Sequence, residues 1–162
     1  MSRRRDIRRC ALQALYQLDA ARGEDSGTIR GSLVESPGDD LTHDEGFALA
    51  NAAWAERDAA DAAVAELAPQ WPTNRQPIVD RSLLRLAYYE MASGITPPKV
   101  AINEAVELAK EYSTEQSPMF VNGVLDKLYR SLRASGVVPD PGEEANEVEH
   151  DADMPDPIGS DG

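Results

Sequence analysis

The sequence predicts an all-α protein, and three observations support that prediction. The apolar content of 41% comes mainly from Ala, Leu and Val, while aromatic residues make up only 6%. Apolar side chains recur at i, i+3, i+4 and i+7, which is the spacing of one helix face, and they do not alternate as they would in strands. The length of 162 residues suits one compact domain.

The first half of the chain predicts a long opening helix and an Ala-rich second one. Residues 3–21 carry a helical stripe of Ile7, Cys10, Ala11, Ala14, Leu15 and Leu18. Residues 22–41 are rich in Gly, Ser, Pro and Asp, so we expect a loop with one short helix near residues 29–35. Residues 42–67 predict one helix or two abutting ones, followed by a connection marked by Pro69, Pro72 and Pro77.

Residues 78–93 predict a helix at the centre of the domain, because apolar side chains lie nearly all the way round it. Gly94 is expected to end this helix. Glu90 lies in an otherwise apolar arc, where a carboxylate must find a partner or reach water. We expect it to form a structural ion pair with an arginine of another helix.

Two further helices complete the predicted fold. Thr96 is expected to cap a helix that has proline in its first turn and ends at about residue 112. Ser117, followed by Pro118, is expected to cap the last helix in the same way, and that helix ends at about residue 134.

The charge is distributed very unevenly. The net charge is -13, but the segment after Arg133 holds nine acids and no Lys or Arg, leaving 20 acids and 16 bases before it. This segment is rich in Pro and Gly and has no periodicity, so we expect a helical domain over 1–135 and a disordered acidic tail over 136–162. At the other end, five arginines fall within the first nine residues: Arg3, Arg4, Arg5, Arg8 and Arg9.

The sequence contains no recognisable enzyme site, and we expect no catalytic activity, cofactor or metal. It lacks a phosphate-binding Gly-rich loop and a Gly-x-Ser-x-Gly turn, and one cysteine with two unrelated histidines makes no metal-ligand cluster. Cys10 cannot form an internal disulfide, which fits a cytoplasmic protein. No apolar run reaches about 18 residues, so no membrane span is expected, and the N-terminal arginines lack the apolar run of a secretory signal.

Two helix faces are candidates for binding. On the first helix Arg5, Leu12 and Tyr16 are expected opposite the apolar stripe, which suits phosphate and partner binding unless other helices cover Leu12 and Tyr16. On the last helix an aromatic ring, a small residue and two cations recur at i, i+3, i+7 and i+10, as single-stranded RNA would require: Phe120, Gly123, Lys127 and Arg130. The alternative is that Phe120 closes the end of a bundle and the cations are only solvated.

Four parts of the sequence resemble the NusB family: the opening with RRR at 3–5 and RCALQALY at 9–16, VDRSLLRLAYYEM at 79–91, PKVAINEAVELAK at 98–110 and FVNGVLDK at 120–127. The resemblance spans most of residues 3–133 and is weak over 22–77. It implies an all-α fold of two small helical bundles packed into one domain, with about six to seven helices.

The resemblance also implies a function. NusB-like proteins bind boxA, a short single-stranded element of nascent ribosomal RNA transcripts, together with NusE, a small-subunit ribosomal protein. The complex keeps RNA polymerase from terminating prematurely. By position, the residues expected at RNA are Arg3, Arg4, Arg5, Arg8, Arg9, Phe120, Asn122, Gly123 and Lys127. Those expected at NusE are Leu12, Tyr16, Asp80, Arg81 and Leu84.

Several alternatives stay open at this stage. The chain resembles the N-terminal domain of ribosomal RNA cytosine methyltransferases as well, but its length leaves no room for a cofactor-binding domain. It could be a helical module that binds protein without RNA, or a homodimer that forms through the Tyr16 side. The acidic tail either folds back on the arginine-rich start and competes with RNA, or only solubilises the protein. Asp6 with Ile7, and Pro118 with Met119, depart from the family pattern where RNA affinity would suffer.

Overall fold

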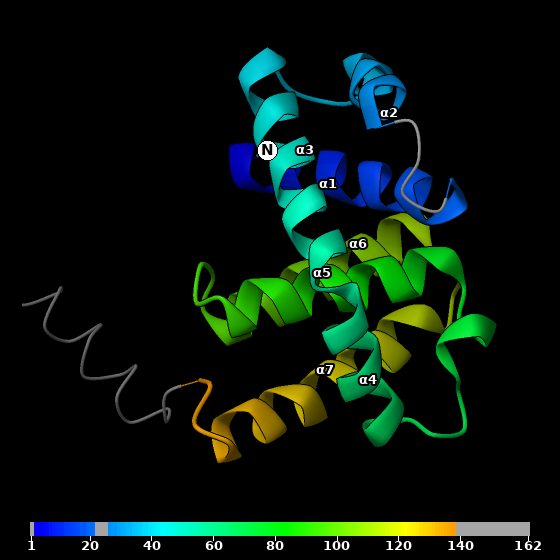
Figure 1. Cartoon of the computed structure of the whole chain (residues 1–162), viewed down its shortest axis with the longest axis vertical. Helices are drawn as coiled ribbons and strands as arrows, with labels where there is room; N and C mark the ends of the chain where they lie inside the picture. The colour runs from blue at the N-terminus through cyan, green and yellow to red at the C-terminus, as the bar shows by residue number, and fades with distance from the viewer. Residues whose placement is uncertain (1, 22–25, 139–162) are drawn as a thin grey trace, which may run out of the picture.

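The computed structural model describes residues 2–21 and 26–138. Within them the chain forms seven α-helices, two short 3-10 helices and no strand, which confirms the all-α prediction (Figure 1). The elements are α1 (Arg3–Ala20), α2 (Ser26–Ser32), η1 (Leu33–Glu35), α3 (Asp40–Ala55), α4 (Arg57–Leu67), η2 (Thr73–Arg75), α5 (Ile78–Ala92), α6 (Pro98–Tyr112) and α7 (Ser117–Ala134). The Ala-rich stretch is therefore two abutting helices, one of the two forms expected.

Two hydrophobic cores divide the described chain into two bundles, as the family resemblance implied. The N-terminal core joins α1, α2, η1 and α3, and Leu86 of α5 reaches into it. The C-terminal core joins α4, α5, α6 and α7, and Leu12 of α1 reaches into it. Figure 1 shows α5 and α6 lying between α1 and α7. The two bundles are fused because α1 and α5 each contribute side chains to both cores.

The N-terminal bundle depends on a close crossing of α1 and α3 at Gly46. A Cβ atom added to Gly46 would lie 2.5 Å from Cβ of Cys10 and 2.9 Å from the backbone oxygen of Ile7. Both distances are too short for a real contact, so only glycine lets the two helices approach this closely. Gly46 was not predicted to have this role, because a helix crossing leaves no local signal in the sequence.

α5 carries the expected buried ion pair. Glu90 pairs with Arg8 of α1, with Nη2 of the arginine 2.9 Å from the carboxylate, and both side chains are almost fully buried. The Thr96 hydroxyl also donates to this carboxylate. Thr96 was expected to cap α6, but that helix begins after Pro97 without a side-chain cap. The reason is that the buried carboxylate takes the Thr96 hydroxyl as its second donor.

The start of α7 is tied to the start of α5. Asp80 is buried and accepts hydrogen bonds from Ser113 at 2.6 Å and from Ser117 at 3.0 Å. Ser117 was expected to be the cap of α7, yet the N-cap position is Gln116, which makes no side-chain cap bond. The Ser117 hydroxyl instead satisfies a carboxylate of another helix, which fixes the α6–α7 turn on the C-terminal bundle.

The last described residues end α7 and pack back on the core. Gly136 adopts φ +82°, and the N–H groups of Gly136 and Val137 donate to the carbonyls of Arg133 and Leu132, which is the Schellman arrangement. Val138 is buried in the C-terminal core. The packed chain therefore continues past the boundary expected at 135. The acidic tail from residue 139 onward, its expected disorder and both hypotheses for it lie outside the described residues.

Candidate RNA and partner interfaces

The arginine-rich start of α1 lies beside acidic residues from three helices. Arg3 pairs with Glu45 of α3 at 2.9 Å, and Arg5 pairs with Glu104 of α6 at 2.9 Å. Arg9 contacts Asp6 at 2.8 Å and Glu111 of α6 at 3.1 Å. Arg4 is exposed, and among the described residues no carboxylate lies within ion-pair distance of it. The cations of this surface are thus largely neutralised in the free protein.

These ion pairs differ in how accessible they are. The side chain of Arg5 is 38% exposed, and its hydrogen bond holds the pKa of Glu104 below the usual range. A phosphate must therefore compete with an ionised carboxylate for Arg5. Arg8 is buried with Glu90, so the structure gives it no surface for RNA, which corrects its place among the expected RNA contacts. It has this position because Glu90 needs a buried cation.

The expected RNA face of α7 is open along most of its length. Asn122, Gly123 and Lys127 are exposed, and a Cβ added to Gly123 would meet nothing within 4 Å. Within the described chain no carboxylate pairs with Lys127, whereas Arg130 pairs with Asp126 at 3.0 Å. A backbone without a side chain, next to a cation without an ion pair, leaves room for a ligand to approach closely.

Phe120 has features of both expected roles, closing the bundle and binding RNA. It is half-buried and packs against the C-terminal core, as a residue that closes the bundle would. It also lines an open groove of about 530 Å³ with residues of the α4–α5 connection and the α7 start, namely Trp71, Gln76, Pro77, Asp80, Thr114, Gln116, Ser117 and Met119. Trp71 was not predicted as a site residue, because the proline-rich segment around it carries the sequence signals of a connection only.

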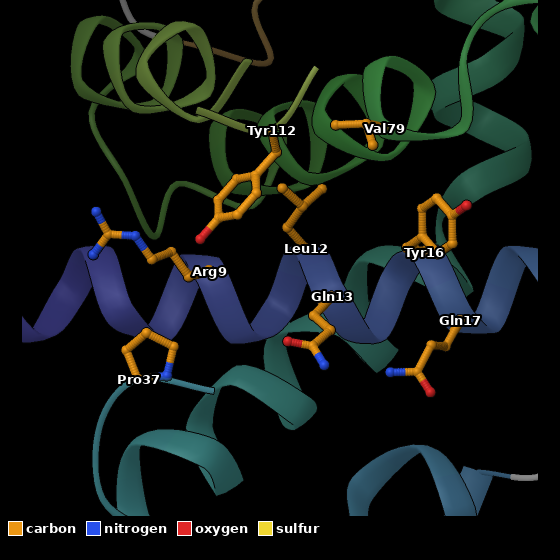
Figure 2. A pocket seen from close by; sticks show the side chains of 8 residues that line it. All are labelled: Arg9, Leu12, Gln13, Tyr16, Gln17, Pro37, Val79 and Tyr112. Carbon is orange, nitrogen blue, oxygen red and sulfur yellow. The ribbon is translucent and has the colours of Figure 1, made fainter. Parts of the chain in front are cut away.

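A second groove follows the outer face of α1, where the partner side was expected. It measures about 420 Å³ and is lined by Arg9, Leu12, Gln13, Tyr16, Gln17, Pro37, Val79 and Tyr112. Figure 2 shows Leu12 pointing from α1 toward α5, between Tyr112 and Val79, with Tyr16 beside it. Tyr16 is 45% exposed, but Leu12 is only 4% exposed because the C-terminal bundle covers it. Leu12 forms the floor of the groove and is not the protruding contact that was expected.

The other expected partner contacts are mostly internal. Leu84 is buried in the C-terminal core, and Asp80 is almost fully buried and held by Ser113 and Ser117, so neither protrudes toward a partner as expected, which corrects their placement. The reason is that α1 covers the start of α5 on one side and α7 covers it on another. Arg81 is partly accessible and binds Asp19 at the end of α1.

Asp19 is the centre of an ionic cluster between the bundles. It accepts hydrogen bonds from Arg81 and Arg85, and Arg85 also binds Asp61 of α4 at 2.7 Å. Burial alone would raise the pKa of Asp19, but the two guanidinium groups outweigh it and hold that pKa below its usual range. The cluster therefore fixes α1, α4 and α5 to one another rather than offering free charges to a partner.

The structure does not bring the two expected RNA groups together. The arginines lie on α1 and the Phe120–Lys127 segment lies on α7, with α5 and α6 between them (Figure 1). None of the described helices is long and apolar enough to span a membrane. In the same residues no three His, Cys, Asp or Glu side chains gather as a metal site.

Comparison with known proteins gives one consistent family. The NusB family model matches residues 5–130. The NusB transcription antitermination protein of Anaeromyxobacter dehalogenans is 42% identical over 139 residues, covering 85% of this chain and 94% of that protein. The one from Trichlorobacter lovleyi is 40% identical over 129 residues, covering 79% of this chain and 91% of that protein. A longer one from Chloroherpeton thalassium is 37% identical, and the aligned part is 65% of its length.

Solved structures agree with the sequence relatives. NusB of T. maritima superimposes with a TM-score of 0.67 at 32% identity, over 80% of this chain and 92% of that one. The NusB chain of a complex of the antitermination factors NusB and NusE with double-stranded RNA superimposes with a TM-score of 0.68 at 27% identity, over 81% of this chain and 98% of that one.

Proposed function

The chain belongs to the NusB family, and from that premise we propose that it is a transcription antitermination factor. It binds the boxA element of ribosomal RNA operon transcripts as single-stranded RNA, together with NusE. The complex keeps RNA polymerase processive, and this chain contributes no catalytic step.

The observation that carries the proposal is the family match over 5–130, because it includes the α7 face, the α1 groove and the α1 arginines from Arg5 onward. The likeness to a NusB chain that is bound to NusE and RNA supports both partners. The RNA of that complex is double-stranded, so the preference for a single strand rests on the chemistry of the α7 face. A half-buried aromatic ring, an open glycine and an unpaired lysine suit stacked bases and their phosphates.

Two groups of contacts form the proposed RNA surface. Arg3, Arg4 and Arg5 at the start of α1 bind phosphates, and Arg9 supports them from beside Glu111. The second group lies on α7 and comprises Phe120, Asn122, Gly123 and Lys127. An RNA that touches both must pass the helices between α1 and α7, so a fragment of only two or three nucleotides should bind one group alone.

The proposed NusE surface is the groove along α1. Tyr16 and Tyr112 are exposed and line this groove. Arg81 of α5 lies near the C-terminal end of α1, where it binds Asp19. Exposed tyrosines around an apolar floor are typical of protein interfaces, because the ring buries area while the hydroxyl stays hydrogen-bonded. A homodimer through the same groove would compete with NusE.

A protein-binding role without RNA is the second candidate, and one observation favours it. Four of the five arginines at the start of α1 already pair with carboxylates. Such a surface attracts phosphate less than the sequence alone suggests. The same groove would then bind NusE, and the α7 face would have no RNA role.

Fluorescence anisotropy of a labelled boxA RNA separates the two functions. The controls are a scrambled single strand and a boxA duplex, each with and without NusE, over a salt series. We expect boxA to bind more tightly than both controls, more so with NusE. The log–log salt slope should be about -3, since each of roughly four phosphate contacts to a single strand contributes about 0.7. Equal, weak binding of all three RNAs with NusE present would leave the protein-binding role.

A further inference from the structure

We propose that the groove between the α4–α5 connection and the start of α7 takes one unpaired nucleobase of the RNA, stacked on Trp71. The inference rests on the proposed function and deepens it, because it assigns a stacking residue outside α7 and a place for a single base. Trp71 has no role in either candidate surface predicted from the sequence.

The backbone of Trp71 is held by hydrogen bonds, although its side chain is exposed. Its backbone N–H donates to the carbonyl of Ala68 at 3.1 Å, and its carbonyl accepts from the buried Gln76 side chain at 3.0 Å. Arg81 also donates to the carbonyl of Thr73 in the same connection. The indole itself remains 57% exposed. A fixed backbone with an open aromatic face lowers the entropy lost when a flat ligand stacks on it.

The start of α7 supplies the other part of the groove. Met119 is 84% exposed, and the half-buried Phe120 lies next to it in the chain. An exposed Trp and an exposed Met around one groove form an apolar patch of the kind that marks a binding site. The groove volume of about 530 Å³ lies within the range of about 300–1,000 Å³ that is typical of small-molecule sites.

The polar groups at the floor of the groove contribute little to base binding, so stacking is the main source of affinity for a base. Asp80 and Ser117 lie there, and the two Asp80 oxygens already accept hydrogen bonds from Ser113 and Ser117. Both residues already hydrogen-bond within the fold and are only 3% and 2% exposed, so they distinguish one base from another weakly. A site built in this way accepts the flat face of a base with little preference for its identity.

The charges near the groove favour RNA over an apolar peptide. Lys127 lies two turns beyond Phe120 on the same flank of α7, about 10 Å along the axis at 1.5 Å per residue. Arg75 is exposed in the connection that holds Trp71, and among the described residues no carboxylate pairs with either cation. Each of the two segments that line the groove, the α4–α5 connection and α7, therefore carries a cation that could bind the phosphates of neighbouring nucleotides. An apolar side chain of a partner protein would use neither.

The test is a coupling experiment on the full chain in complex with NusE. A series of boxA RNAs, each with one abasic position, is titrated against the wild type, Trp71→Ala and Trp71→Phe. Leu41→Ala is the matched control, because Leu41 is an equally exposed apolar residue, on α3, that lines neither groove. NusE binding without RNA is measured for every variant, and so is Tm.

We expect Trp71→Ala to weaken boxA binding by about 5- to 150-fold, the range for loss of one base stack. Trp71→Phe should recover part of that loss. One abasic RNA should bind the wild type more weakly yet lose nothing further with Trp71→Ala. NusE binding, Tm and the Leu41→Ala variant should not change.

Two outcomes would overturn the inference without touching the proposed function. In one, the wild type prefers boxA but Trp71→Ala binds it equally well. In the other, Trp71→Ala weakens NusE binding without RNA, which would make the groove a protein site. If the wild type shows no preference for boxA at all, the proposed function fails and the inference fails with it.

Discussion

Arg5 and Arg8 lie one turn apart on α1, and each pairs with a glutamate of the C-terminal bundle, yet the two pairs belong to different environments. Arg8 and Glu90 are almost fully buried and share Thr96 as a further hydrogen-bond partner. Arg5 and Glu104 form a partly exposed pair near the protein surface, where water and a phosphate can reach them. A basic cluster in a sequence can therefore combine structural and ligand-binding residues that are separated by a single helical turn.

The largest effect expected from this comparison is on the buried pair. Arg8→Ala leaves Glu90 charged and unpaired in the interior, so we expect a loss of about 3–5 kcal/mol in the free energy of unfolding. Urea denaturation measures it. The double variant Arg8→Met with Glu90→Leu removes both charges and should recover most of the loss. A loss below about 1 kcal/mol for Arg8→Ala would show that the pair is not a structural element.

Two glycines extend the comparison between interior and surface to the backbone. Gly46→Ala forces a Cβ against Cys10 and the backbone oxygen of Ile7, where neither can move freely. We expect a destabilisation of about 1–3 kcal/mol, the usual cost of overpacking a core. Thermal unfolding and urea denaturation should agree on it. A stability equal to the wild type would mean that α1 and α3 can separate at little cost.

Gly123→Ala is the surface counterpart and should have a smaller effect of the opposite sign. The added Cβ meets nothing, and alanine is favoured over glycine within a helix by about 0.8–1.0 kcal/mol. We therefore expect a stabilisation of up to about 1 kcal/mol with weaker boxA binding, because RNA could no longer reach the backbone. A stabilised variant with unchanged RNA affinity would remove Gly123 from the proposed contacts.

The sequence predicted the helices well because their signals are local. The apolar stripe of α1, the continuous apolar surface of α5 and the proline-marked starts of α6 and α7 all lie within single segments. The partner of Glu90 was predicted only as an arginine, since nothing local distinguishes Arg8 from Arg9. The burial of Leu12 and Leu84 could not be predicted from one helix, because it depends on a second bundle packing against α1. Trp71 was missed because its exposure depends on a turn held by Gln76.

The smallest effect on stability is expected for the partly exposed pair of Arg5 and Glu104. This pair also gives the most direct test of whether Arg5 binds RNA while Arg8 is structural. Arg5→Ala should change stability far less than Arg8→Ala, because an exposed pair contributes little. The RNA effects should be opposite for the two partners. Arg5→Ala should weaken boxA binding and reduce the salt slope by about 0.7, whereas Glu104→Gln frees Arg5 and should tighten binding. Arg30→Ala, which breaks the exposed pair with Asp44, is the control.

Acid provides an independent check on the same pair. Arg5 holds the pKa of Glu104 below its usual value, so the pair stabilises the fold above the unfolded pKa of about 4.3 and loses that contribution as the pH falls through the folded pKa. The small stability difference between wild type and Arg5→Ala in urea should therefore be present at neutral pH and vanish in strong acid. If it persists there, Arg5 acts through packing of its aliphatic stem, and neutralisation by Glu104 is not what limits its access to RNA.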